Sequence, residues 1–284
     1  MAMAKRLRPP TSPASSDRRI AAAALAARRR ARAVVRATAL VTVTAVGYGG
    51  LVAGQTVLGR TTPAARRFRQ RMFRRWCGVV VRILGICIQV RGELPTAPFM
   101  LVTNHLSYID ILVLGASLEA VFLARHDIAT WPVIGWAAER LGTVFINRRD
   151  FGDLQSVNAT IHGVLERGDG VVLFPEGTST DGRKVGPFRS PVLEPAAALK
   201  LPVAYGALSY ATPPGEPPAH NSVCWWGDAE FAPHFWAMLH IAAIDAPLAF
   251  GPDRVEHADR KALAAALHER VTAMFVPVIT GEGS

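Results

Sequence analysis

Short apolar runs alternate with stretches of helical periodicity from residue 90 to near the end of the chain. Seven of these runs are short and apolar enough to be strands, and they lie at 98–103, 120–123, 143–146, 171–174, 202–208, 222–225 and around Leu248. Helices are expected at 109–118, 153–167, 192–199 and 258–275. We therefore predict an α/β domain over residues 90–284, with a mixed, largely buried sheet flanked by helices.

Ahead of this domain lies a 23-residue segment, 37–59, that contains no charged residue. As a helix it would be about 34 Å long, which is enough to cross a bilayer. Glycines, threonines and Gln55 make it only modestly apolar, and basic residues flank both ends, so the positive-inside rule gives no orientation. A membrane-spanning helix, a re-entrant or interfacial hairpin with both ends on the cytoplasmic face, and a buried helix of a soluble protein remain open.

A second helix is expected directly after this segment. Its apolar residues recur at helical spacing among arginines, at Phe68, Met72, Trp76, Val79 and Ile83. A basic amphipathic helix of this kind suits an anionic lipid surface. A DNA-binding helix is the alternative, although no helix-turn-helix or zinc module accompanies it. Residues 37–89 are therefore predicted to be a membrane-spanning or re-entrant segment followed by a basic amphipathic helix.

Charge is divided unevenly along the chain. Of the 32 Lys and Arg residues, 19 lie in residues 1–92 together with one acid, Asp17. Residues 93–284 carry the other 13 basic residues and 21 of the 22 acidic ones. A basic head indicates a polyanionic partner, either nucleic acid or anionic lipid. Residues 1–36 are poor in large apolar side chains, so we expect a disordered or loosely helical basic tail there.

The sequence T-N-H-L-S-Y-I-D, residues 103–110, follows the first expected strand of the domain. His105 and Asp110 would point about 140° apart on one helix, so they can meet only if His105 lies in a loop and a helix starts between them. Ser107 fits the N-cap, and Asp110 then lies where the helix N-terminus favours a carboxylate. A carboxylate on one ring nitrogen leaves the other free to accept a proton, as a general base requires. Taken alone, the pattern fits a hydrogen-bonded loop histidine equally well.

Two further strand ends carry polar groups. G-T-V-F-I-N-R-R, residues 142–149, places Arg148 and Arg149 at a strand end, and guanidinium groups suit phosphate. V-V-L-F-P-E-G-T-S-T, residues 171–180, places Glu176 in a tight turn after a buried strand. Ligands of open α/β sheets bind at such strand ends. An ordinary turn glutamate is the alternative.

Together, and in this order, these motifs resemble the glycerolipid acyltransferase family typified by bacterial 1-acylglycerol-3-phosphate acyltransferase. The matching parts are the Asn-His-x-x-x-x-Asp loop, the F-x-x-R strand end, the F-P-E-G turn and the apolar strand that opens with proline at 201–204. The resemblance covers roughly residues 90–210. The family's N-terminal membrane-docking helices would match residues 37–88.

The resemblance implies that His105 deprotonates the acceptor hydroxyl, which attacks the acyl thioester, and that Asp110 orients His105. No serine or cysteine nucleophile accompanies the pair, which favours this direct attack. Arg148 would bind the acceptor's phosphate, and Glu176 and Gly177 would position the acceptor. The full set of candidate substrate-binding residues is Asn104, Arg148, Glu176, Gly177, Thr178, Arg183, Lys184 and Arg189.

The resemblance also implies the partners. The acyl donor would be acyl-CoA or acyl carrier protein, whose acidic surface would find a basic docking surface in the head, and the acceptor would be a membrane lysolipid. We expect no metal or redox cofactor and no nucleic acid. Histidines among the tryptophans, such as His234, are expected to pack rather than bind metal. The enzyme would lie at the inner membrane, with the catalytic domain on the cytoplasmic face.

One position departs from the phosphatidate-forming members, which often read F-P-E-G-T-R. Here the last residue is Ser179, although Arg183, Lys184 or Arg189 would supply a replacement charge. The form E-G-T-S/T-x-D-G looks more like the branch that acylates lyso-ornithine lipid, which lacks phosphate. We predict an O-acyltransferase for a lysophospholipid such as 1-acylglycerol-3-phosphate in membrane lipid biosynthesis, with lyso-ornithine lipid as the alternative acceptor. A non-catalytic basic membrane-binding protein is the alternative of another class, and the absence of G-x-S-x-G disfavours a lipid ester hydrolase.

Overall fold

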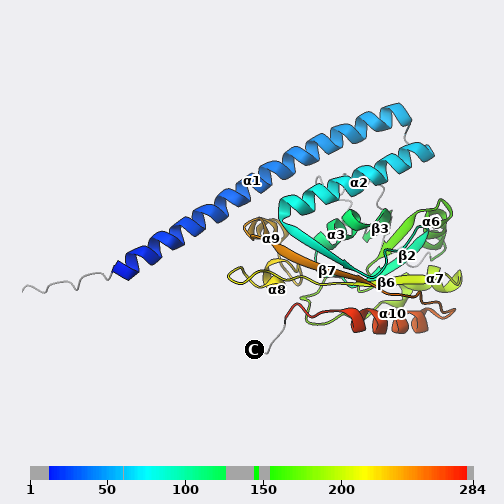
Figure 1. Ribbon diagram of the computed structural model, residues 1–284. Coiled ribbons are helices and arrows are strands. Elements are labelled where there is room, and N and C mark those ends of the chain that lie inside the picture. Colours follow the sequence, from blue (N-terminus) through cyan, green and yellow to red (C-terminus); the bar gives the residue numbers. More distant parts are fainter. Residues whose placement is uncertain (1–12, 60, 126–143, 147–153, 280–284) are drawn as a thin grey trace, which may run out of the picture.

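The computed structural model describes residues 13–59, 61–125, 144–146 and 154–279 (Figure 1). In this part of the chain, seven strands form one sheet in the order β1-β7-β6-β2-β5-β3-β4. The strands are β1 (Ile86–Arg91), β2 (Phe99–Thr103), β3 (Ala120–Arg125), β4 (Val144–Ile146), β5 (Gly170–Leu173), β6 (Val203–Leu208) and β7 (Ile244–Phe250). Neighbouring strands are parallel, except that β6 and β7 are antiparallel. The predicted mixed sheet is confirmed.

The two faces of the sheet carry separate apolar cores. The central strands β2 and β6 are buried along their whole length, as expected where helices cover both faces. One core joins the sheet to α2 (Pro63–Leu84), α3 (Ile109–Ser117) and α9 (Phe231–Met238). The other joins it to α6 (Leu154–Glu166), α7 (Glu194–Ala198) and α10 (Arg260–Met274). Figure 1 shows α2 and α3 on one side of the sheet and α10 on the other.

The segment at 222–225 is not the predicted strand. The short helix α8 (Ala219–Ser222) ends there, and the backbone N–H groups of Val223 and Cys224 both donate to Ala219 O at 2.8 and 2.9 Å. Because both N–H groups are used in this tight turn, they cannot donate to a neighbouring strand. The apolar run at 222–225 alone therefore does not indicate a strand. The short 3-10 helix η2 (Ser190–Leu193) leads into α7, at the helix predicted for 192–199.

The domain begins earlier than predicted. β1, I-C-I-Q-V-R, starts directly after α2 and pairs in parallel with β7 over its full length. The α2 helix ends at Gly85, which has a left-handed φ of 74°, so the chain turns into the strand without a linker. The amphipathic pattern of α2 runs up to this point, which is why the start of the sheet was expected at residue 90.

Of the two forms expected for the basic tail, disordered or loosely helical, residues 13–36 adopt the helical one. One helix, α1 (Pro13–Leu58), extends for 46 residues through both the basic tail and the uncharged segment. Three arginines on one face of it hold it to the domain: Arg29 donates to Gly215 O at 2.9 Å, Arg32 to His240 O at 2.8 Å and Arg36 to Ala242 O at 3.0 Å. The alanines of this segment favour a helix, and the three arginine contacts stabilise its position on the domain. Composition alone does not show these contacts, because their partners lie far along the chain. Residues 1–12 lie outside the described part.

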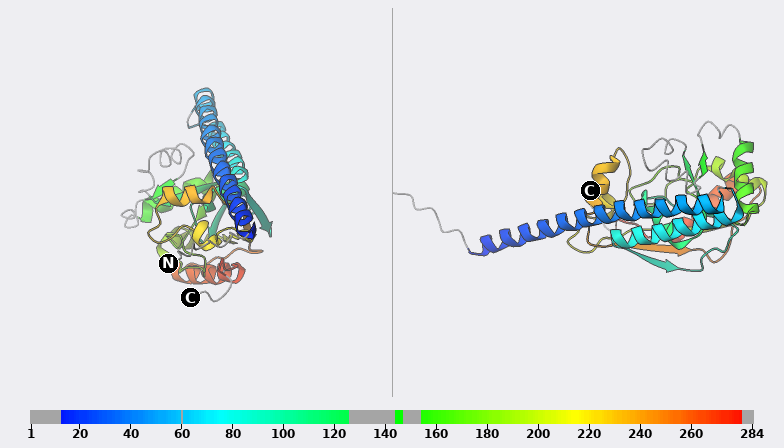
Figure 2. Two further views of the ribbon diagram at one scale, coloured as in Figure 1. Left: turned by 90° about the vertical axis from the view of Figure 1, so that its left-hand side faces the viewer. Right: turned by 90° about the horizontal axis from the view of Figure 1, so that it is seen from above.

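α1 and α2 form an antiparallel hairpin that lies along the domain (Figures 1 and 2). The Trp76 indole donates to Thr44 Oγ1 at 3.2 Å, and Phe68 packs against Gly54 of the opposite helix. Glycines that make the 37–59 segment modestly apolar therefore allow α2 to approach closely. At the tip of the hairpin, Arg66 donates to Arg167 O at 2.9 Å and lies 3.4 Å from an Asp169 carboxylate oxygen. Both ends of the hairpin are thus held to the same domain.

By length and composition, α1 can cross a membrane. Its stretch Asp17–Leu58 has a mean hydropathy of 1.5 in its most apolar window, of which only 6% is buried in the protein. Large apolar side chains on it face outward, among them Val41, Val46 and Val57 with exposed fractions of 71%, 69% and 83%. An uncovered apolar face of this extent fits a lipid environment.

Candidate active site

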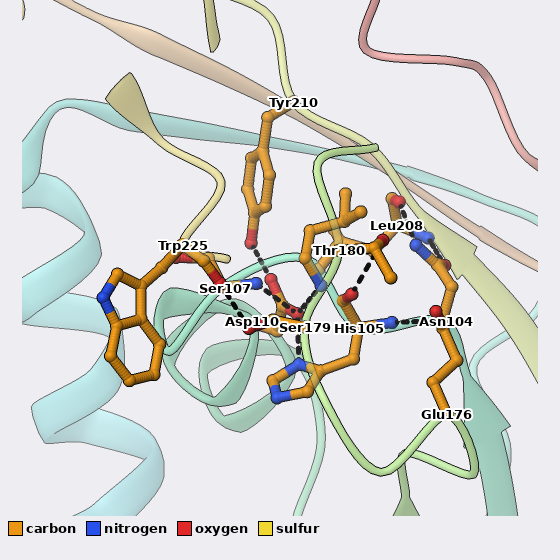
Figure 3. A network of polar contacts seen from close by, with 11 residues as sticks. Asn104, His105, Ser107, Asp110, Glu176, Ser179, Thr180, Leu208, Tyr210 and Trp225 are labelled. Carbon is orange, nitrogen blue, oxygen red and sulfur yellow. Dashed lines mark hydrogen bonds and ion pairs between the residues drawn. The ribbon is translucent and has the colours of Figure 1, made fainter. Parts of the chain in front are cut away.

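The candidate site lies where two neighbouring parallel strands end. β2 leads into the loop that carries His105, and β5 leads into the Pro-Glu-Gly turn at 175–177. Both loops therefore emerge at the carboxyl edge of the sheet, where open α/β sheets bind their ligands. Figure 3 shows the two loops joined by a network of polar contacts.

His105 and Asp110 meet, as the sequence predicts. Nδ1 of His105 lies 2.7 Å from Oδ2 of Asp110. A carboxylate can only accept, so Nδ1 carries the hydrogen of the neutral ring and Nε2 keeps a free lone pair. The ring stacks on Phe174 with centroids 4.3 Å apart, and Nε2 points away from the network (Figure 3). The geometry suits acceptance of a proton by Nε2.

The start of α3 differs from the predicted cap. Tyr108 occupies the N-cap position and makes no side-chain capping bond, and Ser107 Oγ is buried with no hydrogen-bond partner in the described part of the chain. Asp110 takes over this role, since its Oδ2 accepts from the backbone N–H of Leu106 at 2.7 Å and of Ser107 at 3.0 Å. One oxygen thereby fixes both the loop backbone and the imidazole.

Tyr210 also reaches Asp110, a contact that sequence reasoning missed. Its hydroxyl donates to Oδ1 at 2.6 Å, and both side chains are buried. Burial and, after it, the negative charge of Asp110 raise the pKa of Tyr210 well above its usual value of 10, so the phenol remains a donor. The available signal was its place, two residues past β6, a strand that borders β2.

Glu176 bonds the backbone of the site from within, and its expected role in positioning the acceptor stays a prediction. Its side chain is only 4% exposed, and its two oxygens accept from the backbone N–H of His105 at 2.7 Å and of Gly186 at 2.9 Å. Burial raises the pKa of Glu176 to about 7, although those two N–H groups oppose the rise. The carboxylate fixes the position of the His105 backbone and the 175–186 loop relative to each other.

Asn104 also bonds the backbone, and its expected role in substrate binding stays a prediction. Its Nδ2 donates to Leu208 O at 2.9 Å and its Oδ1 accepts from Leu208 N at 2.8 Å. The side chain is 1% exposed. These paired bonds extend the contact between β2 and β6 past the end of the strands and set the direction of the His105 loop.

The remaining predicted substrate-binding residues lie along the loop after β5. Gly177 has a left-handed φ of 71° and packs under the side chain of Arg189, which donates from Nε to Glu176 O at 3.1 Å. Thr178 and Lys184 are exposed, and Arg183 is exposed with its Nε 2.9 Å from Asp181. The structure thus brings Gly177 and Arg189 to the site, while Arg148 lies outside the described residues.

A third segment, 219–238, closes one side of the site. Trp225 N donates to Leu106 O at 2.8 Å, and the hydroxyl of Ser179 donates to Trp225 O. On α9, His234 Nε2 lies 3.0 Å from Cys224 O and Nδ1 lies 3.0 Å from the Tyr108 hydroxyl. A carbonyl only accepts, so Nε2 carries the hydrogen of the neutral ring and Nδ1 accepts from Tyr108. The expectation that His234 packs rather than binds metal missed this link to the loop that carries His105.

Comparison with known proteins gives the class first. A protein-family model described as acyltransferase matches residues 86–205, which contain the loops after β2 and β5. The fold matches the crystal structure of the 1-acyl-sn-glycerophosphate acyltransferase PlsC from Thermotoga maritima with a TM-score of 0.60 at 19% identity, covering 86% of this chain and 96% of that one. Fold and site therefore define an acyltransferase domain.

Two relatives then give the family. The lyso-ornithine lipid O-acyltransferase of Pseudomonas aeruginosa is 33% identical over 236 residues, which are 80% of this chain and 89% of that protein. The 1-acyl-sn-glycerol-3-phosphate acyltransferase of Neisseria meningitidis is 29% identical over 199 residues, 69% of this chain and 77% of that protein. The chain belongs to the glycerolipid acyltransferase family to which both relatives belong, and it is an acyltransferase.

Proposed function

We propose that His105 is the general base of an acyl transfer from acyl-CoA or acyl carrier protein to the free hydroxyl of a membrane lysolipid. Nε2 takes the hydroxyl proton as the oxygen attacks the thioester carbonyl. The carbon–sulfur bond then breaks, and the imidazolium returns the proton to the leaving thiolate. The observation that carries this proposal is the 2.7 Å contact between His105 Nδ1 and Asp110, because it holds the ring as the tautomer that accepts at Nε2. Asp110 also stabilises the imidazolium that forms.

The acceptor that fits best is lyso-ornithine lipid. Ser179 stands where phosphatidate-forming members often carry arginine, and its hydroxyl is engaged with Trp225 O in the segment that closes the site. A short neutral side chain in this position supplies no charge for a phosphate. The relative that is 33% identical bears the name of a lyso-ornithine lipid O-acyltransferase, which supports the same choice.

A lysophospholipid such as 1-acylglycerol-3-phosphate is the second candidate acceptor. Arg189 lies over Gly177, and Lys184 is exposed on the same loop. Two cations beside the Pro-Glu-Gly turn would attract a phosphate even without an arginine at position 179. Arg148, as the F-x-x-R arginine, would add to this charge.

Membrane association follows from the hairpin, and we propose that α1 lies in the plane of the membrane surface. Arg36 at one end of the hairpin and Arg66 at the other both contact the catalytic domain, which supports a course of the 37–59 segment along one side of the bilayer. The outward valines of α1 would enter the lipid, and the arginines of its N-terminal half would meet anionic headgroups. The catalytic domain would lie on the cytoplasmic face of the inner membrane.

The test is acyl transfer by the purified full-length enzyme. Labelled acyl-CoA and acyl carrier protein are each offered with lyso-ornithine lipid and with 1-acylglycerol-3-phosphate. We expect transfer to lyso-ornithine lipid, lost by at least about 10³-fold in His105→Ala because the general base is gone. His162→Ala, a substitution of a half-exposed histidine on α6, is the matched control and should keep the wild-type rate.

Each result has a distinct meaning. Near-wild-type transfer by His105→Ala would show that another group is the base. Preference for 1-acylglycerol-3-phosphate in the unmodified enzyme would leave the mechanism intact and move the acceptor to the phosphate-bearing class.

A further inference from the structure

Asp110 is a fully buried carboxylate whose two oxygens have different partners. Oδ2 faces the catalytic loop, where it contacts His105 Nδ1 and accepts from two backbone N–H groups. Oδ1 faces the opposite way and accepts from Tyr210 at 2.6 Å. Among the hydrogen bonds of the described residues, this is the one that Oδ1 receives.

Tyr210 lies too deep to touch substrate. Its side chain is 2% exposed. Tyr210 follows β6 and lies five residues beyond the end of the match to the acyltransferase family model, which covers residues 86–205. The phenol oxygen is the one polar atom of the Tyr210 side chain, and it is directed at Asp110 (Figure 3). A buried carboxylate needs donors for each oxygen, since an unsatisfied lone pair in this environment is costly.

We propose that Tyr210 is a positioning residue that acts on His105 through Asp110. The inference rests on the proposed role of His105 as base. By holding Oδ1, the phenol fixes the plane of the carboxylate so that Oδ2 points at Nδ1. It also withdraws part of the negative charge from the side that faces the imidazole. The relay in this enzyme then has three members, His105, Asp110 and Tyr210, and the third comes from the C-terminal part of the sheet.

Removal of the phenol hydroxyl has a defined kinetic signature. In Tyr210→Phe the carboxylate loses its donor at Oδ1 and is held through Oδ2 alone, so kcat should fall about tenfold while KM stays within about twofold. The charge that Tyr210 withdrew returns to Asp110 and favours the protonated imidazole. The acidic limb of the profile of kcat/KM against pH should therefore move to higher pH.

The other titratable groups near Asp110 are the same in the wild type and in Tyr210→Phe. Burial raises the pKa of Cys224 and of Tyr108 far above neutrality, so both stay neutral over the measured range. Glu176, with a pKa of about 7, titrates within the range but is present in both proteins. The difference between the two profiles therefore reports on the hydroxyl of Tyr210.

A matched control uses Tyr205, a buried tyrosine within β6. Its hydroxyl donates to Asp253 at the surface, whereas among the hydrogen bonds of the described residues Asp110 accepts from Tyr210 and not from Tyr205. Tyr205→Phe should keep the wild-type kcat and pH profile. If Tyr210→Phe behaves like Tyr205→Phe, the inference is wrong, whereas loss of activity in His105→Ala would still support the proposed base.

Two further measurements decide how Tyr210 acts. In the Asp110→Asn background, Tyr210→Phe should have almost no additional effect, and full additivity would show that the tyrosine does not act through Asp110. Difluorotyrosine placed at position 210 keeps the shape and donates more strongly, so the acidic limb should move to lower pH, even where the phenylalanine variant folds poorly. An unmoved limb would overturn the proposal. A fully active His105→Ala would overturn it together with the base assignment.

Discussion

Single residues in this site act mainly by holding the backbone. Asn104 bonds the main chain of β6, and Glu176 and Asp110 bond the main chain of the loop that carries His105. Among the hydrogen bonds of the described residues, His105 Nε2 takes part in none. The sequence predicted the meeting of His105 and Asp110 because five residues at a loop–helix junction permit one geometry. It could not predict that Glu176 and Asn104 turn inward, since polar residues at strand ends serve support and binding alike.

Glu176 should give the free energy of unfolding a recognisable pH dependence. Its pKa rises from 4.5 in the unfolded chain to about 7 in the fold, so the fold favours the protonated form. The stabilisation is complete below pH 4.5 and is lost as pH rises through 7, by at most about 3 kcal/mol. Denaturant unfolding at several pH values should show this slope in the wild type and not in Glu176→Gln.

The control for that measurement is Glu166→Gln, because the Glu166 side chain is exposed on α6. It should retain the wild-type slope. Parallel slopes in the wild type and Glu176→Gln would mean that folding does not change the pKa of the Glu176 carboxyl.

At the scale of elements, strands with continuous apolar sequence were predicted well and short aromatic helices were not. β2 and β6 are buried on both faces and therefore read as uninterrupted apolar runs. α9, F-A-P-H-F-W-A-M, has eight residues, contains proline and is held by contacts distant in sequence, so no local pattern marks it. Its attachment depends on His234 at one end and on the arginines of α1 at the other.

His234→Phe should loosen α9 while preserving the ring volume. It removes the bonds to Tyr108 and Cys224 O, so amide hydrogen exchange over residues 226–238 should become about ten- to a hundredfold faster. Desolvation lowers the pKa of His234 below its usual value of 6.5. In the wild type the bonds of the neutral ring therefore hold α9 near and above neutral pH, and they weaken as the pH falls through this lowered pKa. His257→Phe, at an exposed loop position, is the control, and equal exchange in the two variants would refute the role of His234.

For the whole molecule, the sequence predicted an α/β domain joined to membrane-associated helices but left the course of the 37–59 segment open. Hydropathy and flanking charge depend only on local composition, whereas the proposed in-plane course rests on contacts from Arg36 and Arg66 to residues far along the chain. Arg29 and Arg32, together with Arg36, hold the last part of the basic tail to residues equally far along the chain.

The orientation of α1 can be tested by cysteine labelling in sealed membrane vesicles. Cys77 and Cys224 are buried, and Cys87 is exposed on the catalytic domain, where it marks the side of the domain. In a Cys87→Ser background, Arg28→Cys and Thr61→Cys lie beyond opposite ends of the uncharged segment. Both should react from the side on which Cys87 reacts in the wild type. Labelling of position 61 from the opposite side would establish a spanning helix.

The arginine face of α1 also sets an order of events during synthesis. Arg29, Arg32 and Arg36 leave the ribosome early, yet their partners lie 186 to 208 positions later in the chain. Until those partners emerge, the three arginines are free to bind anionic lipid together with the outward valines of α1. The nascent chain would thus reach the membrane before its catalytic domain is complete, and the last part of the domain would close onto a helix that is already anchored.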